Sequence, residues 1–136
     1  TNLLVLKYFK NEEPNKPDCV LDSSLRSILD DGFIIIGDCI FLDKVLHWDF
    51  ERNLNGIGRM KTDFLDLSGI ENANNKIHID DYVSQEVFEK SFIFLYFFKT
   101  YWYKEFPNIS CFISLSFQDD EIGELATFSF HKYRKK

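Results

Sequence analysis

The segment ISCFISLSFQDDEIGELATFSFH, residues 109–131, decides the fold class. Apolar and polar residues alternate from Ile109 to Phe117 and again from Leu125 to His131. This period of two is typical of strands that bury one face against a core. Residues 118–123 separate the two runs and contain the polar and glycine residues of a turn. The segment therefore predicts a C-terminal antiparallel β-hairpin.

A helical pattern precedes this hairpin and extends from Ser84 to about residue 105. Ser84 is a suitable N-cap, Glu86 suits the positive end of a helix dipole, and Pro107 ends the helix. The expected apolar face, widened by Ile93, Tyr96 and Phe97, consists of Val87, Phe88, Phe92, Leu95, Phe98 and Trp102. A buried strand over residues 91–98 is the alternative, since periodicity alone does not distinguish the two.

The first 42 residues predict three further elements. Residues 3–9 (LLVLKYF) have the composition of a strand. Residues 22–32 predict a short helix capped by Asp22 or Ser23 and ended by Gly32, with Leu25, Ile28 and Leu29 on its buried face. The runs 33–36 and 39–42 flank Gly37-Asp38, which favours a type II′ hairpin, although one bent strand with a glycine bulge is also compatible.

The middle of the chain is less regular. Residues 45–50 (VLHWDF) predict a third strand, and residues 51–76 predict a long irregular segment with a possible short strand at 64–67. Together the patterns predict a single α+β domain spanning residues 1–136. A mostly antiparallel sheet of about five to seven strands, with the C-terminal hairpin, would pack against one long aromatic-rich helix, next to the short N-terminal helix.

Charge is distributed unevenly along the chain. The net charge is −6, from 16 basic and 22 acidic residues. Four of the basic residues lie in the last five positions, so the rest of the chain has 12 basic against 22 acidic residues, or −10. An acidic surface disfavours binding to nucleic acid and favours association with a basic protein. The basic end is interpreted as a solvated, frayed terminus.

Cysteine content and hydropathy indicate the compartment. The three cysteines, Cys19, Cys39 and Cys111, form no C-x-x-C pair, which predicts buried free thiols in a reducing environment. The longest apolar run, 92–98, has seven residues, whereas a membrane span needs about 20. The chain shows no secretion signal at its start. We therefore expect a cytoplasmic protein that does not bind membranes.

No pattern of catalytic or metal-binding residues stands out. His47, His78 and His131 lack the spacing of metal ligands, and no serine or cysteine lies in a nucleophile motif. Residues 55–59 (NGIGR) resemble half a phosphate loop but favour a turn. The sequence therefore predicts no catalytic residue, no metal and no cofactor. A small hydrolase or nuclease that uses histidines, for example His47 and His131, is the alternative.

Two acidic clusters are the candidate partner-binding residues. Asp119, Asp120 and Glu121 occupy the predicted hairpin turn, with Glu124 just beyond it. Asp80 and Asp81 precede the long helix, and Trp48 could add an aromatic anchor. These residues predict a surface that meets a basic protein.

The acidic body, the hairpin of residues 109–131 and the aromatic helix VFEKSFIFLYFFKTYWYKEF (87–106) together resemble the immunity proteins of bacterial polymorphic toxin systems, such as those of contact-dependent growth inhibition. The resemblance implies a cytosolic, non-enzymatic inhibitor that binds one toxin domain, often a nuclease, and blocks its active site. It transfers no residue-level role. A structural subunit of a larger assembly is a further alternative.

Overall fold

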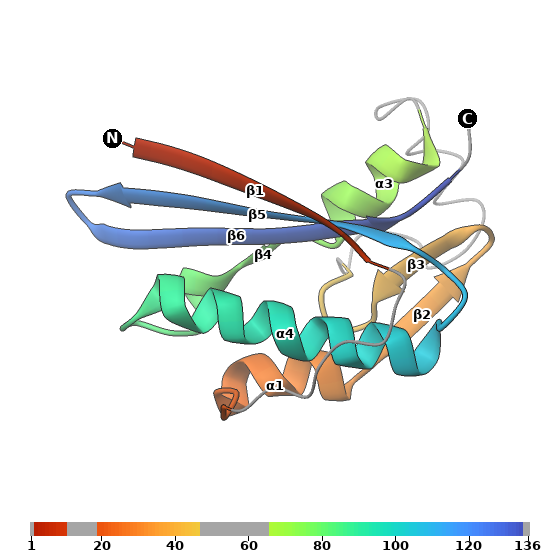
Figure 1. Cartoon of the computed structure of the whole chain (residues 1–136), viewed down its shortest axis with the longest axis horizontal. Coiled ribbons are helices and arrows are strands. Elements are labelled where there is room, and N and C mark those ends of the chain that lie inside the picture. Colours follow the sequence, from red (N-terminus) through yellow and green to blue (C-terminus); the bar gives the residue numbers. More distant parts are fainter. Residues whose placement is uncertain (1, 11–18, 47–65, 135–136) are drawn as a thin grey trace.

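The central element of the fold is an antiparallel sheet, seen in a computed structural model that describes residues 2–10, 19–46 and 66–134 (Figure 1). Its described strands lie in the order β1-β5-β6-β4. Their bounds are β1 Asn2–Lys10, β4 Ile77–His78, β5 Cys111–Asp120 and β6 Gly123–Lys132. The predicted first strand and C-terminal hairpin are confirmed.

The turn of this hairpin is shorter than the sequence predicted. Asp119 pairs with Glu124 and Asp120 with Gly123. The ladder of the hairpin therefore ends only at the Asp120–Gly123 pair, directly beside the turn. Of the predicted turn residues, only Glu121 and Ile122 connect the strands. The acidic side chains at 119, 120 and 124 therefore lie on strands, with directions fixed by the pleat of the sheet.

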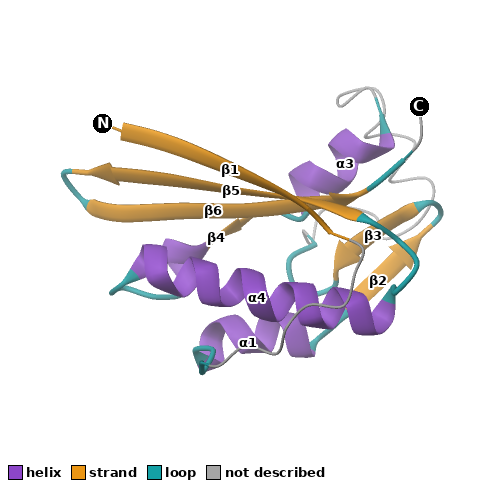
Figure 2. Ribbon diagram, viewed as in Figure 1, coloured by secondary structure: helices purple, strands orange, loops and turns teal. Residues whose placement is uncertain are grey.

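Helix α4, Val87–Glu105, packs along one face of the sheet (Figure 2). A helix over this region is confirmed, and the alternative strand at 91–98 is wrong. The predicted cap is also wrong, because the N-cap is Glu86 in a left-handed conformation (φ 54°) and not Ser84. The predicted apolar face is broadly correct, but Tyr96 is 51% exposed and does not widen it.

Helix α1, Ser23–Asp30, packs beside α4 and matches the predicted short helix. Its buried residues are Leu25, Ile28 and Leu29, as predicted. Gly32 has φ +76°, the left-handed conformation that glycine adopts without strain. Asp22 is the N-cap residue but makes no side-chain cap bond, and its carboxylate instead lies 3.3 Å from Lys90 Nζ on α4.

Strands β2, Phe33–Ile36, and β3, Cys39–Leu42, form the predicted hairpin as a sheet of their own. Gly37 has φ +60°, as a type II′ turn requires at this position, so the bent-strand alternative is wrong. The prediction of one sheet of five to seven strands is also wrong, because the six described strands divide into sheets of four and two.

Two strands predicted for the middle of the chain, at 45–50 and 64–67, are absent from those of their residues that the structure describes. The amides of Val45 and Leu46 donate to the Leu42 carbonyl in a turn, so the predicted strand at 45–50 does not begin there. Residues 47–50 lie outside the described residues. The predicted strand at 64–67 is replaced at Leu67 by helix α3, Leu67–Asn74, whose N-cap Asp66 accepts a hydrogen bond from the Gly69 amide at 2.7 Å. A short 3-10 helix, η1 (Ile79–Asp81), follows β4.

The core has two parts that meet at the β2–β3 hairpin. Ile40 and Leu42 join the main core between the sheet, α4 and α1. Cys39 and Phe41 point to the other side and join Ile70 of α3 in a smaller core. Helix α3 packs on the face of the large sheet that α4 leaves open (Figure 1). The α+β class with a long aromatic helix on an antiparallel sheet is thus confirmed.

The three cysteines are free thiols, but they differ in accessibility. Cys39 and Cys111 are buried as predicted, whereas Cys19 is exposed, which corrects that part of the prediction. Burial, followed by the nearby Glu71 carboxylate, raises the pKa of Cys39 to about 11. Burial also raises the pKa of Cys111.

We therefore expect one fast-reacting thiol in the native protein, because the thiolate is the reactive form. An aromatic disulfide reagent at pH 8 should modify Cys19 rapidly and all three cysteines after denaturation. Cys19→Ser should remove the fast phase, and Cys39→Ser should leave it intact. A fast phase of two thiols in the native protein would contradict the burial of Cys39 and Cys111.

Candidate protein-binding site at the acidic end

The β5–β6 turn forms one end of the molecule and carries acidic side chains on both strands. Asp120 Oδ1 accepts a hydrogen bond from the Ile122 amide at 2.9 Å and closes the turn. Asp119 and Glu124 are directly opposite each other in the ladder. Two like charges in such a pair repel each other, which costs stability unless another charge or dipole compensates.

Carboxylates also attach the segment before α4 to this hairpin. Asp80 Oδ1 accepts a hydrogen bond from the Ala126 amide of β6 at 3.1 Å. Glu124 Oε1 accepts one from the Phe88 amide, in the first turn of α4, at 3.2 Å. The positive end of the α4 dipole is a favourable place for Glu124, and it offsets part of the repulsion from Asp119.

These contacts bring together the two acidic clusters that are separate in the sequence. We call the combined surface the acidic end. It consists of eight carboxylates from η1, the start of α4 and the hairpin: Asp80, Asp81, Glu86, Glu89, Asp119, Asp120, Glu121 and Glu124. The hairpin turn and the first turn of α4 lie at the same end of the molecule in Figure 1. None of the eight forms an ion pair with a residue that the structure describes.

An open cavity of about 510 Å³ lies between the hairpin and the segment that leads into α4. Asp80, Glu86 and Glu124 supply its carboxylates. Val83, Val87, Ile122 and Leu125 supply apolar surface. Ile122 is 85% exposed at the tip of the turn. A basic side chain with an aliphatic stem, such as lysine or arginine, matches this combination of charge and apolar surface.

A second, apolar depression of about 220 Å³ lies beside the acidic end, between β1, β5 and α4. We call it the apolar groove. It is lined by Leu4, Phe88, Phe92, Phe117 and Asp119. The Phe117 ring is 5.1 Å, centroid to centroid, from both Phe88 and Phe92, so the floor of the groove is a packed aromatic layer.

Comparison with known proteins places the chain in a family. A family model described as the Uncharacterized protein PM0498 family matches residues 1–136. The chain belongs to the PM0498 family. It is 38% identical to Uncharacterized protein PM0498 of Pasteurella multocida (strain Pm70) over 135 residues, which cover 98% of this chain and 82% of that protein. No solved structure matches this PM0498-family chain.

The basic C-terminal segment lies at the opposite end of this PM0498-family protein. It was predicted to be frayed, but its described residues, up to Arg134, are held by ion pairs. Arg134 Nη1 donates to the fully buried Glu71 at 2.5 Å, and Arg134 Nε lies 3.2 Å from Asp38 Oδ2. Lys132 Nζ contacts the other oxygen of Asp38 at 2.6 Å. The hydrogen bond from Lys132 is the largest cause that lowers the pKa of Asp38, followed among the lowering causes by the bond from Arg134.

Glu71 and Asn75 of this terminal network also complete the outer edge of β3. Glu71 Oε2 accepts a hydrogen bond from the Ile40 amide at 2.5 Å, and Asn75 Oδ1 accepts one from the Leu42 amide at 2.9 Å. Asn75 Nδ2 donates to the Ile40 carbonyl at 2.9 Å. Side chains four residues apart on or beside α3 therefore replace a neighbouring strand. Sequence patterns did not point to these residues because they did not predict α3, although the i, i+4 spacing of Glu71 and Asn75 after the N-cap Asp66 was an available signal.

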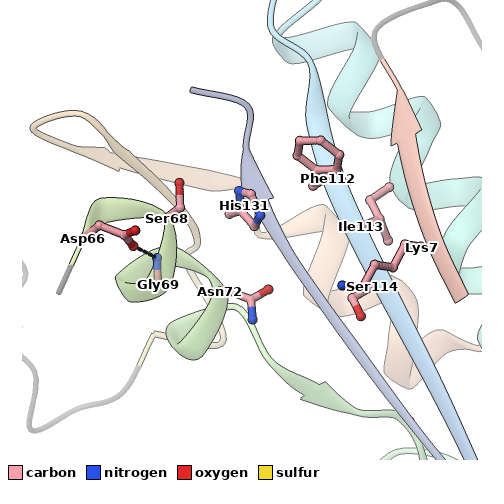
Figure 3. A pocket seen from close by; sticks show the side chains of 9 residues that line it. All are labelled: Lys7, Asp66, Ser68, Gly69, Asn72, Phe112, Ile113, Ser114 and His131. Carbon is pink, nitrogen blue, oxygen red and sulfur yellow. Dashed lines mark hydrogen bonds between the residues drawn. The ribbon is translucent and has the colours of Figure 1, made fainter. Parts of the chain in front are cut away.

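A third cavity, of about 520 Å³, lies between α3 and the open face of the sheet and has both polar and apolar lining residues (Figure 3). Lys7, Ser114 and His131 line it together with Phe112, whose ring centroid is 5.4 Å from that of His131. His131 Nδ1 donates to the Lys132 carbonyl at 3.0 Å, since a carbonyl only accepts. Within the described residues, no serine or cysteine is hydrogen-bonded to His131, so no nucleophile–base pair is formed there.

The remaining site predictions have mixed outcomes. His78, the last residue of β4, has its Nδ1 3.2 Å from Thr127 Oγ1, whereas Asp80 lies in η1. Among the described residues, no group of three or more His, Cys, Asp or Glu side chains is arranged to hold a metal ion. Trp48, His47 and residues 55–59 lie outside the described residues.

The aromatic residues at the end of α4 serve the fold. Trp102 is buried and its Nε1 donates to the Ile109 carbonyl at 2.8 Å. Tyr101 donates to Asp30 on α1 at 2.6 Å. This hydrogen bond is the largest cause that raises the pKa of Tyr101.

In the part of the chain that the structure describes, no helix combines the length and apolar character needed to cross a membrane.

Proposed function

We propose that this PM0498-family protein is a toxin-neutralising immunity protein. It acts in the cytoplasm, binds the basic domain of a cognate toxin through the acidic end, and makes or breaks no covalent bond. One observation carries the proposal: the fold gathers eight carboxylates from two distant segments into one surface that the described cations leave unpaired.

The physical basis is electrostatic complementarity. A nuclease toxin needs a basic cleft to hold phosphates, and an acidic surface can fill that cleft. Unpaired carboxylates concentrated at one end create a directional field that accelerates encounter with a basic partner. Ile122 and the apolar groove place apolar area beside this charge, and such area contributes affinity that charge alone does not supply.

Charge reversal at the acidic end should slow association with the toxin. The double variant Asp119→Lys/Glu121→Lys changes exposed residues whose side chains cap no amide, unlike Asp80, Asp120 and Glu124. We expect the association rate constant to fall by about tenfold or more at low salt, and by less as salt rises. The measurement is stopped-flow binding to the protein encoded directly upstream of this gene, where toxin genes usually precede their immunity genes.

The matched control is the double variant Asp31→Lys/Glu105→Lys, which adds the same charge away from the acidic end. It should reduce the rate several-fold less than the acidic-end variant. If both variants lower the rate equally, the effect comes from net charge and the acidic end is not the contact surface. If neither changes binding, the proposed electrostatic mechanism is wrong.

A further inference from the structure

Strand β1 has a free edge with respect to the strands that the structure describes. It lies at one side of the four-stranded sheet, and β5 is the described strand that pairs with it, over all nine residues. In an antiparallel ladder, backbone groups of alternate residues point away from the paired neighbour. The outward N–H and C=O groups of β1 therefore form no ladder with any strand in the described part of the chain. An edge of this kind can accept another strand.

The outer edge of β3, unlike that of β1, is covered by hydrogen bonds from side chains. Glu71 and Asn75 hold the outward groups of Ile40 and Leu42 on β3. At the other side of the large sheet, β4 has only two residues. The first half of β1, by comparison, is long and continuously apolar over residues 3–6, with its first lysine at position 7. Natural proteins usually protect such edges with charge, proline or a bulge.

Both faces of this half-strand are open. Leu3 and Val5, on the side away from α4, are 68% and 45% exposed. Leu4, on the α4 side, is 56% exposed and lines the apolar groove with Phe88, Phe92 and Phe117. A strand added beside β1 would therefore find apolar surface for alternate side chains on each face of the sheet.

Charge identifies the occupant. Asp119 is the ladder partner of Asn2 and lines the apolar groove, and it is opposite Glu124. A second copy of this chain would bring a like net charge of −6 to this edge, and in a parallel pair it would also place a second acidic end beside the first. A segment with lysine or arginine among its apolar residues would instead neutralise Asp119 while covering Leu3, Leu4 and Val5.

We propose that the basic partner adds an extended segment of alternating apolar and basic residues to the free edge of β1, as a further strand of the sheet. This inference rests on the proposed function and specifies where and how the partner binds. Apolar side chains of the added strand enter the apolar groove and cover the opposite face. Its basic side chains lie toward the acidic end.

The probe is a fluorescent peptide in which valine and lysine alternate, measured by anisotropy with the full chain. We expect it to bind more tightly, by about tenfold or more, than a peptide of alternating glycine and lysine with the same charge. N-methylation of one alternate set of its amides should weaken binding by about tenfold or more, because it removes the donors of the ladder. In the complex, amides between Leu3 and Lys7 should exchange hydrogen more slowly, while those of Ile77 and Phe128 should not change.

Val5→Lys tests the edge on the protein side, and Ile35→Lys is its matched control. Ile35 is also an apolar strand residue, 61% exposed, but it belongs to β2. Val5→Lys should weaken peptide binding by at least about tenfold more than Ile35→Lys. If Val5→Lys does not fold, hydrogen exchange of the β1 amides in the unmodified chain, with and without peptide, still supports or overturns the inference.

Three results would overturn the inference. Equal binding of the glycine–lysine peptide would show electrostatic attraction without strand addition. Absence of peptide binding, or of protection in β1, would exclude the edge. A dimer of this chain that protects β1 would identify a second copy as the occupant. None of these three results bears on the proposed function, which is tested by the charge-reversal experiment with the toxin. The inference and the proposed function can therefore fail separately.

Discussion

Phe98→Ala is expected to lower the free energy of unfolding by about 4 kcal/mol, as measured by urea denaturation. Phe98 is fully buried on α4. Its ring centroid lies 4.9 Å from that of Phe128 and 4.7 Å from that of Phe130, both on β6, and 5.9 Å from that of Phe33 on β2. The side chain thus joins the long helix to both sheets. Alanine would leave a cavity that three separate elements cannot easily close.

Tyr96→Ala is the matched control for this prediction. Tyr96 lies on the same helix, but it is 51% exposed, and its ring contact with Lys99 Nζ is long at 5.8 Å. We expect this variant to change stability by less than about 1 kcal/mol. Phe98→Leu, which retains most of the volume, should fall between the two. Equal losses for Phe98→Ala and Tyr96→Ala would mean that the ring cluster does not organise the core.

Local periodicity was sufficient to predict the elements of this core. Helix α4 and the β5–β6 hairpin have patterns of 3.6 and two residues that extend over several turns or strand pairs. Gly32 and Gly37 marked a helix end and a hairpin turn because both positions need positive φ. In each case the information lies within a few residues of the feature that it predicts.

The remaining features depend on contacts between distant segments. Helix α3 contains Gly69 and three asparagine or serine positions with low helix propensity, so packing of Ile70 against the β2–β3 hairpin outweighs local preference. The split into two sheets follows from the side chains of Glu71 and Asn75, which occupy the edge of β3 where another strand could have paired. Neither effect leaves a periodic signal in the sequence.

The candidate site shows the same division. The two acidic clusters are separate segments of the sequence, at residues 80–89 and 119–124. Their convergence depends on the pairing of β4 with β6 and on the hydrogen bonds from Asp80 and Glu124 across elements. The free edge of β1 follows from strand order, which alternation along one strand does not determine.

The buried Glu71 should be the most sensitive polar position. Its two carboxylate oxygens accept hydrogen bonds from the Ile40 amide of β3, the Lys132 amide of β6 and the guanidinium of Arg134. We expect Glu71→Ala to lower the free energy of unfolding by about 4 kcal/mol in urea denaturation, because it leaves a partly buried cation and two amides without their acceptor. Glu89→Ala, at an exposed carboxylate, should cost less than about 1 kcal/mol.

A double-mutant cycle with Arg134→Ala separates the charge pair from the amide bonds. Arg134, which also pairs with Asp38, is the cation, so removing it with Glu71 eliminates the guanidinium that has lost its buried partner but not the lost acceptors at Ile40 and Lys132. The double variant should therefore be more stable than the sum of the single losses predicts, by about 1–3 kcal/mol. Its Ile40 amide should still exchange hydrogen faster than in the unmodified chain. Strict additivity would show that Glu71 acts through the strand edges alone and that its pair with Arg134 contributes no net stability, which is the outcome that desolvation of both charges would produce.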